Sequence, residues 1–367
     1  MRTRPIALLL TAALLLTLAG CGAPRRERGA AQDEPQRLPD APAPAGAEAL
    51  RSVEAAFPLL SAPLSEAESE EMVNHNARRC AMLAVNYYYC RCLYADGSCA
   101  LVRYEIVDNV LRHRTRLVPD CPADFLCQSG ERLYYLGADR GVESVSTDGG
   151  GRRRELDAPC LSLQLHGGTL YCLRRDGVLL ALRGGAEETL LEGCSWAFVT
   201  ERGIFYTAAA DGRAHLFDPA ARTDMTLSAE AALSPTLIGT TLYYTADEEG
   251  ARRLCALELA DGTRRRMETA FTGEAEFLRG WDGEWQLRVT GLGGAAGQQL
   301  LPLGAAFDGT QPAQEAQGGF ARRCRGLDDV LHTDELLGPD GESLGFELVL
   351  PGGLSIPSLA ADNAPED

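Results

Sequence analysis

The chain has 367 residues, of which 45% are hydrophobic and 24% are charged, and its formal net charge is −17. All 35 basic residues are arginines. This acidic balance argues against a nucleic-acid-binding protein and against broad electrostatic adhesion to an anionic lipid surface.

Residues 1–20 have the features of a secretory signal peptide, a positively charged start followed by an apolar run. Arg2 and Arg4 precede an apolar run from Ile6 to Ala19, which is shorter than the roughly 20 residues that span a bilayer. Leu-Ala-Gly-Cys then ends at Cys21 and resembles the bacterial lipobox, in which the cysteine is acylated and becomes the new N-terminus. The resemblance implies lipidation of Cys21 and a membrane-anchored, extracytoplasmic location. An ordinary cleaved signal with an incidental cysteine is the alternative.

Residues 21–79 are expected to link the lipidated cysteine to a folded domain. From Gly22 to about Pro63 the chain is rich in Ala, Pro, Glu and Arg, a composition that buries little surface and forms a disordered tether. Ser65-Glu66-Ala67-Glu68 has the spacing of a capping box and predicts a short helix through Met72. An acidic solvated segment is the alternative there.

From residue 80 onward, a strand-turn unit recurs along the chain. Its clearest copy, Gly168–Leu182, contains an aromatic and aliphatic strand, an Asp-Gly pair and a second apolar strand. Asp-Gly suits a two-residue type I′ turn because Gly takes positive φ freely and Asp tolerates it. The copies are spaced 34 to 46 residues apart when they are marked by Tyr88, Tyr134, Tyr171, Phe205, Tyr243, Gln286 and Leu331.

A period of roughly 40 residues with several strands in each repeat is typical of a β-propeller with about four strands per blade. We therefore predict an all-β fold, a propeller of about seven blades over residues 80–357, with six blades as the alternative. An acidic tail over 358–367 follows. Leu161–Leu165 is expected to be an innermost strand, with Leu170–Leu173 next outward.

Two further expectations concern packing and closure of the ring. One ring of each aromatic pair is expected to be buried between neighbouring blades. The last repeat, around Gly341–Leu350, looks shorter than a full blade. We therefore expect a strand at Met82–Val85 or Tyr87–Cys90 to complete it, because pairing between the two ends of the chain removes two exposed sheet edges.

The pattern of an apolar-Tyr-Tyr strand, an Asp-Gly turn and an apolar strand resembles an uncharacterised bacterial family described as like the low-density-lipoprotein-receptor-related β-propeller. The resemblance covers roughly Cys80–Pro351 and is strongest between Leu133 and Asp261. It implies a fold and an exported location, and no catalytic residue follows from it. The pattern is less similar to the pyrroloquinoline-quinone-type repeat of outer-membrane assembly lipoproteins, because no tryptophan occupies their Gly-Trp position.

Eleven cysteines remain besides Cys21. Export permits disulfides, and the five cysteines between Cys90 and Cys127 are dense enough to bridge the early blades. Buried free thiols are expected at Cys160, Cys172, Cys194 and Cys255, within or beside strand patterns. The pairing stays open.

Candidate functional residues are few. Asp328, His332 and Asp334 belong to a cluster of acids with a histidine, which could ligate a cation and is otherwise a solvated loop. Trp281 and Trp285 lie beside acids and could grip a sugar, with packing of one in the core as the alternative. The sequence contains no His-Glu-x-x-His and its five histidines are scattered, so we expect no enzyme and no cofactor.

These patterns predict a lipid-anchored extracytoplasmic propeller that is a binding platform for an envelope protein or ligand, such as a glycan. Two other functions stay open. A glycan-active enzyme working in the central channel needs two carboxylates that converge at the channel mouth. An accessory or sensor lipoprotein of a transport system needs a concave apolar pocket with a few convergent polar groups.

Overall fold

Within each sheet of the described part, strands that are consecutive in the chain pair as antiparallel neighbours. The structure, a computed structural model, describes residues 51–358 except 54–56, 61, 85, 94–97, 108–109, 249, 274, 280–283, 296–297, 308–313, 316–319, 326–331, 338–342 and 350–354. The described residues all belong to one compact unit, residues 42–367. The other unit, residues 1–41, lies outside the described part together with the predicted signal peptide and Cys21.

The strands form seven sheets, each built from four consecutive strands. In chain order the sheets are β2 (Ala81–Ala84), β3 (Tyr87–Leu93), β4 (Cys99–Val107) and β5 (Val110–Pro119); β6 (Asp124–Ser129), β7 (Arg132–Leu136), β8 (Val142–Ser146) and β9 (Arg153–Leu156); β10 (Cys160–His166), β11 (Thr169–Arg174), β12 (Leu179–Arg183) and β13 (Ala186–Leu191); β14 (Cys194–Thr200), β15 (Gly203–Ala208), β16 (Arg213–Asp218) and β17 (Thr223–Ala231); β18 (Leu233–Ile238), β19 (Thr241–Glu248), β20 (Ala251–Glu258) and β21 (Arg264–Arg266); β22 (Ala275–Arg279), β23 (Trp285–Thr290), β24 (Gln298–Pro302) and β25 (Gln314–Glu315); and β26 (Phe320–Arg325), β27 (His332–Leu337), β28 (Ser343–Val349) and β29 (Ser355–Ser358).

Three short elements and one further strand complete the described part. Strand β1 (Arg51–Val53) adds to the outer strand β17 in parallel, so that sheet has five strands. Helix α2 (Glu66–Asn76) lies at the centre, and two 3-10 turns, η1 (Leu292–Gly294) and η2 (Gly304–Phe307), flank β24.

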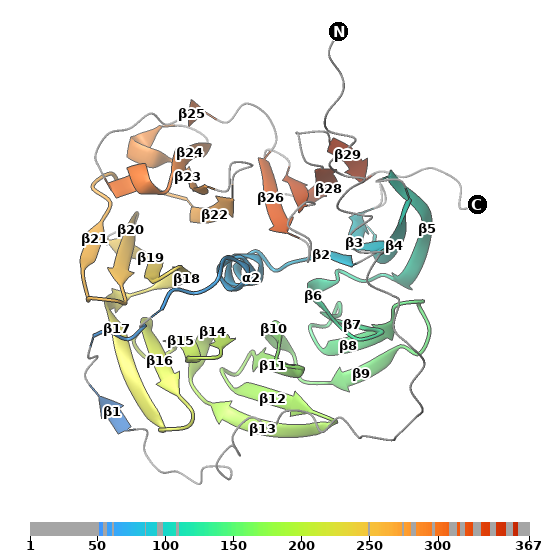
Figure 1. Ribbon diagram of the computed structural model, residues 1–367, viewed down its shortest axis with the longest axis horizontal. Coiled ribbons are helices and arrows are strands. Elements are labelled where there is room, and N and C mark those ends of the chain that lie inside the picture. Colours follow the sequence, from blue (N-terminus) through green and yellow to red (C-terminus); the bar gives the residue numbers. More distant parts are fainter. Residues whose placement is uncertain are drawn as a thin grey trace, which may run out of the picture. The chain divides into compact units, whose positions relative to one another are not determined.

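The sheets of this unit stand around α2, with the first strand of each sheet innermost (Figure 1). Innermost strands β2, β6, β10 and β14 contact one another in turn, and β22 contacts β26, which contacts β2. Radially arranged four-stranded antiparallel sheets make a β-propeller, as the period of roughly 40 residues predicts. The predicted innermost strand Leu161–Leu165 is part of β10, and the marker residues lie in second strands, apart from Leu331, which is outside the described residues.

The predicted closure of the ring is wrong. Strands β2 and β3 pair with each other and with β4, and the last sheet has four strands of its own. The last sheet is complete because β26 precedes the marker position 331 and β29 follows residue 350. First and last sheets meet by packing, with β3 against β28 and β2 against β26, so no strand is shared between the chain ends.

The repeated Asp-Gly pairs form turns, but the predicted two-residue type I′ geometry is wrong at the clearest copy. Among residues 175–178, which connect β11 to β12, only Gly177 has positive φ. The Gly177 amide donates to the Arg174 carbonyl at 3.0 Å, and the Val178 amide donates to Asp176 Oδ1 at 3.4 Å. The glycine therefore supplies the left-handed residue of a longer loop, and the aspartate accepts from the backbone two residues on.

The position of the Asp-Gly pair also differs between sheets. Asp176 and Asp211 follow the second strand of their sheets, whereas Asp148 and Asp261 follow the third. Second and third strands run in opposite directions, so the two sets of turns lie at opposite ends of their sheets. In each set the carboxylate accepts an amide two residues further on: Gly150, Val178, Arg213 and Thr263.

Both rings of the Phe205–Tyr206 pair are buried, whereas one was expected; in the Tyr134–Tyr135 pair only Tyr135 is buried, as expected. Phe205 packs in a cluster with the sheet that follows in sequence, and Tyr206 packs with the sheet that precedes it. They are 1% and 5% exposed. Successive side chains of a strand point to opposite faces, and each blade has a neighbour on both faces, so both positions are apolar.

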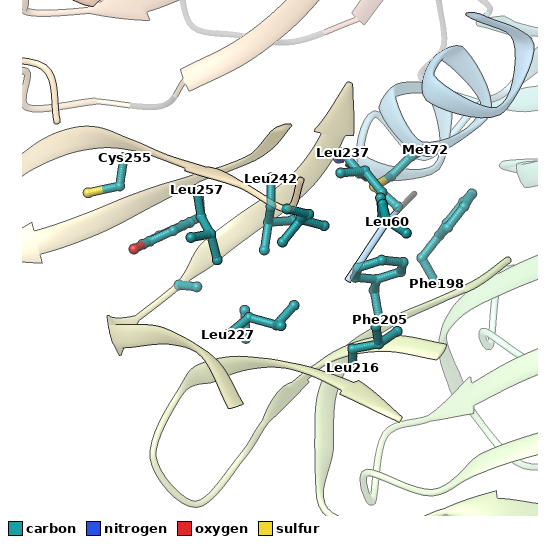
Figure 2. Packing of buried hydrophobic residues seen from close by; sticks show 14 of the residues in the cluster. Leu60, Met72, Phe198, Phe205, Leu216, Leu227, Leu237, Leu242, Cys255 and Leu257 are labelled. Atoms are coloured by element: carbon teal, nitrogen blue, oxygen red, sulfur yellow. Dashed lines mark hydrogen bonds between the residues drawn. The ribbon is translucent and has the colours of Figure 1, made fainter. Parts of the chain in front are cut away.

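Residues assigned above to the linker pack inside the propeller. Ser65 caps α2 by accepting from the Glu68 amide, and Glu68 accepts in return from the Ser65 amide, as the capping box predicts. The helix continues past Met72 to Asn76. Figure 2 shows Leu60 and Met72 against side chains of the two sheets that begin with β14 and β18. The folded part therefore begins before residue 80, at Phe57 or earlier.

The ten described cysteines with resolved surroundings are free thiols. Nine are buried and Cys99 is partly exposed. Burial raises the pKa of Cys121, Cys127, Cys194 and Cys255 to about 12, which keeps these groups protonated and unreactive at neutral pH.

Candidate functional site

A pocket of about 410 Å³ opens beside the C-terminal end of α2. Its other walls are the first residues of β6, β10, β14 and β18 and the loops that follow β7 and β11. In an antiparallel sheet the start of the first strand and the end of the second lie at the same end. The hollow therefore lies at one mouth of the central channel, and we call it the channel-mouth pocket.

Four of the seven innermost strands border the pocket, and each of these four carries a β-bulge there. The register with the second strand slips by one residue, and the bulges contain Phe125 in β6, Leu161 in β10, Ser195 in β14 and Ser234 in β18. All four residues line the pocket. The described pairs β2–β3, β22–β23 and β26–β27 have no such slip in their innermost strands. Bulges re-aim side chains and are common beside binding sites.

Unusual backbone conformations gather at the same place. Eight non-glycine residues of the described chain have positive φ, and four of them line the pocket: Arg78, Phe125, Arg140 and Ser234. A left-handed conformation costs a non-glycine residue about 1–2 kcal/mol. Strain of this kind clusters at functional sites, where the position of a side chain matters more than local stability.

Three arginines give the pocket a positive lining. Arg78 follows α2, Arg140 follows β7 and Arg175 follows β11. None of the twelve described lining residues is an aspartate or glutamate, although the whole chain carries −17. The guanidinium groups of the exposed Arg78 and Arg175 make no hydrogen bond or ion pair within the described residues, so their donors face solvent and are available to an anion.

Arg140 is held in one place between two blades. Its guanidinium donates to Asp124 Oδ2 at 2.6 Å, to the Cys160 carbonyl at 3.1 Å and to the Leu161 carbonyl at 2.6 Å. Burial lowers the pKa of Arg140, Asp124 opposes that shift, and the neighbouring charges of Arg78 and Arg175 reinforce it. Arginine stays charged under such a shift. The three guanidiniums thus repel one another across the pocket, and a bound anion relieves that repulsion.

The end of α2 supplies the floor and fixes the aromatic wall. Trp196 Nε1 donates to Asn76 Oδ1 at 2.7 Å, and Asn76 Nδ2 donates to the Pro235 carbonyl at 2.9 Å and to Thr236 Oγ1 at 2.8 Å. His75, the residue before Asn76 in the helix, contacts the rings of Phe125 and Trp196 edge-on. The Asn76 side chain thereby sets the position of Trp196 relative to the helix and to strand β18.

His75 is a neutral, apolar-like part of this floor. Burial, followed by the positive charge of Arg79, lowers the pKa of His75 from 6.5 to about 3, against a weaker opposing effect of the Ala197 backbone. Its Nε2 atom is buried and has no hydrogen-bond partner among the described residues. His75 is thus uncharged at neutral pH and adds no positive charge to the three arginines.

The described residues that the sequence predicts as site residues do not line the pocket. Cys21, Trp281 and Asp328 are outside the described residues. Trp285 opens β23, is half-buried and packs against a hydrophobic cluster, as the core alternative predicts. His332 and Asp334 belong to strand β27, so the predicted solvated loop is wrong at these two positions. Because the bulges and the α2 floor bring together residues 75 to 234, no local motif marks the pocket.

No group of three or more His, Cys, Asp or Glu side chains in the described residues is arranged to hold a metal ion. Within the same residues, no helix has the length and apolarity needed to cross a membrane.

The chain matches no family model and no curated protein. Similar solved structures include a Mycobacterium tuberculosis puromycin-hydrolyzing peptidase (13% identity, TM-score 0.49), which covers 86% of this chain, while this chain spans 57% of that one. The N-terminal domain of Nup159 has 13% identity and a TM-score of 0.44, over 74% of this chain and 90% of that one. BamB from Moraxella catarrhalis has 10% identity and a TM-score of 0.39, over 75% and 94%. All three TM-scores are below 0.5, so these likenesses say nothing about the chemistry of this chain.

Proposed function

We propose that this chain is a lipid-anchored protein of the extracytoplasmic face of the cell membrane, and that its seven sheets are the blades of a propeller whose channel-mouth pocket binds a partner protein of the envelope. The lipobox-like segment ending at Cys21 supports the anchor. Lipidation at that residue would place the propeller on a tether at the membrane surface.

The observation that carries the binding function is the clustering of bulges and strained residues around one hollow. Four consecutive innermost strands depart from regular pairing only where they border the pocket. A scaffold that needed only stability would keep regular ladders, as three other innermost strands do. The bulges contain Leu161 and Ser195, which are exposed at the rim, and the guanidiniums of Arg78 and Arg175 beside them have no partner in the described chain.

A partner protein suits the rim of the pocket. Leu161 and Leu233 are two of the three large hydrophobic residues that are exposed in the described chain, at 37% and 40%. Leu161 lines the pocket, and Leu233 directly precedes Ser234, which also lines it. Trp and Arg in a pocket with apolar residues at the edge are the composition of protein-binding hot spots.

The pocket has different features in common with the two alternative functions, a channel-centred enzyme and a sensor or accessory lipoprotein. A channel-centred glycosidase needs a pair of carboxylates, and the twelve described lining residues contain none. A sensor or accessory lipoprotein of a transport system would use the same hollow for a small ligand, which its volume of about 410 Å³ accommodates. The exposed Leu233, beyond the lining, favours the larger partner.

Affinity capture with paired variants tests the binding function. Ser195→Tyr fills the pocket from the start of β14, and Glu201→Tyr places the same side chain just past the other end of that strand. The full-length protein is immobilised, incubated with solubilised envelope of the source cells, and the captured proteins are identified by mass spectrometry. We expect Glu201→Tyr to retain the partner and Ser195→Tyr to lose it. Equal capture by both variants would place binding elsewhere.

The anchor is tested separately by fractionation. Cys21→Ser removes the thiol that would be acylated, so the protein should move from the membrane fraction to the soluble extracytoplasmic fraction. Retention of Cys21→Ser in the membrane fraction would refute lipidation as the anchor.

A further inference from the structure

The exposed guanidiniums of the channel-mouth pocket point to the chemistry of its ligand. We infer that the pocket binds a carboxylate of an acidic, apolar-flanked peptide segment, with Arg78 and Arg175 as the residues that receive it; this rests on the proposed binding function. Arg78 and Arg175 are both exposed, line the hollow from the end of α2 and from the loop after β11, and have side chains with no described partner. A planar guanidinium binds a carboxylate with two parallel hydrogen bonds.

Arg140 acts as the fixed positive charge between them. Its three hydrogen bonds to Asp124, Cys160 and Leu161 leave its side chain little freedom, and they connect the starts of β6 and β10. Asp124 also accepts from Arg91 at 3.2 Å, so two arginines share this single carboxylate. The local charge therefore stays positive after Asp124 is counted. Arg140 attracts an anion electrostatically and does not have to move to do so.

Charge complementarity selects a single anionic group over a polyanion. The pocket is positive within an acidic chain, so long stretches of phosphate backbone or an anionic lipid surface would meet repulsion outside the pocket. A peptide brings one or two carboxylates into the hollow and little charge elsewhere. Binding then depends on short-range contacts, which salt weakens moderately.

The apolar rim indicates what lies beside the carboxylate. Trp196 is half-buried, fixed through Asn76, and faces the hollow with Leu161. Leu233 is exposed next to the lining. These side chains suit an apolar residue that flanks the acidic one in an extended segment. A free small carboxylate would leave Leu233 unused.

Selection from a random peptide library tests the inference. The full-length protein is immobilised, peptides are selected from the library, and the affinities of those that bind are measured by titration. We expect Asp or Glu next to Leu, Ile, Phe or Val to be enriched. The double variant Arg78→Gln/Arg175→Gln should lower their affinity at least tenfold, which is about 1.4 kcal/mol. The control Arg112→Gln/Arg153→Gln has the same net charge, removes exposed arginines of the outer strands β5 and β9, and should bind as the wild type does.

Three results would overturn the inference. Selected peptides without acidic enrichment, or acidic peptides that bind both double variants equally, would show that Arg78 and Arg175 do not receive a carboxylate. Succinate that binds as tightly as the peptides would show that a small organic acid is the ligand. Circular dichroism and thermal melting of both double variants establish that each is folded. Loss of capture by Ser195→Tyr together with non-acidic peptides would leave the proposed function standing and reject only this inference.

Discussion

Trp196 Nε1 donates a hydrogen bond to Asn76 Oδ1 at 2.7 Å, and this contact joins the central helix to a blade 120 residues further along the chain. Asn76 is the last residue of α2, and Trp196 lies at the bulged start of β14. The pocket wall therefore depends on the segment that precedes the first sheet. Removing residues 57–76 would open the channel and also release the aromatic wall of the site.

Asn76→Ala should destabilise the fold. The amide makes hydrogen bonds with Trp196, the Pro235 carbonyl and Thr236, and truncation leaves these groups without their partner. Loss of such a network costs about 2–3 kcal/mol in the free energy of unfolding. Urea denaturation followed by circular dichroism measures it. The control Asn86→Ala, at an exposed position, should change stability by less than about 0.5 kcal/mol; an equal effect of both substitutions would show that the network contributes nothing.

The buried His75 predicts a loss of stability in acid. The pKa of His75 is about 3 in the folded protein, whereas an unfolded chain protonates near 6.5. The unfolded state therefore binds more protons between these values, and stability falls as the pH decreases from about 6.5 toward 3, by at most about 1.4 kcal/mol per pH unit. Above pH 6.5 this contribution is fully present.

His75→Phe should remove that part of the pH dependence. Urea midpoints at pH 7 and pH 4.5 should differ less in His75→Phe than in the wild type. His113→Phe changes an exposed histidine of β5 and should keep the wild-type dependence. The same difference between the two pH values in all three proteins would mean that His75 does not titrate on unfolding.

Gln164 should be a stabilising link between two blades. Its Nε2 donates to the Val199 carbonyl at 2.8 Å, and its Oε1 accepts from the Val199 amide at 2.8 Å, so one side chain satisfies the backbone of the neighbouring innermost strand. Gln164→Leu leaves both buried groups unpaired, and we expect a loss of about 2–4 kcal/mol in the free energy of unfolding. Thermal melting tests this, because the loss should lower the melting temperature of Gln164→Leu below that of the wild type. An unchanged melting temperature would refute the link.

Two glycines with positive φ should differ in their tolerance of alanine. A Cβ at Gly203, with φ of 133°, would lie 2.6 Å from the Phe217 carbonyl oxygen, so Gly203→Ala should cost about 3 kcal/mol. Gly184 has φ of 55° and nothing within 4 Å of an added Cβ, so Gly184→Ala should cost about 1 kcal/mol. Chemical denaturation of both variants gives the comparison, and a smaller loss at Gly203 would contradict it.

The sequence predicts the propeller because its signals are local and repeated. The strand before each Asp-Gly pair and the capping box at Ser65 depend on residues a few positions apart. It does not predict that α2 enters the channel, because the helix carries buried polar residues such as Asn74 and His75 and has no apolar face that would reveal its place. A helix surrounded by innermost strands can satisfy polar side chains on several sides.

The pocket could not be predicted because its residues come from seven separate segments. Arg78 and Arg175 lie 97 positions apart, and each looks like an ordinary charged residue beside a turn. Ser195 and Leu161 are set apart only by the bulges, which depend on pairing with the second strand. One signal was present in the sequence. Ser195-Trp196 begins one repeat unit, and Arg174-Arg175 ends the second strand of the unit before it, so both pairs lie at the same end of neighbouring units.

Photo-crosslinking in intact cells tests the central claim, that the channel-mouth pocket is the binding surface. A photoreactive amino acid replaces Ser195 or Ser234 at the pocket. In the controls it replaces Glu131 or Glu201, in the turns that follow β6 and β14 at the opposite end of their sheets. We predict that Ser195 and Ser234 crosslink one dominant envelope protein, that Glu131 and Glu201 do not, and that Arg78→Gln/Arg175→Gln lowers the yield. Equal yields at both ends of the sheets, or crosslinks only at Glu131 and Glu201, would contradict the claim.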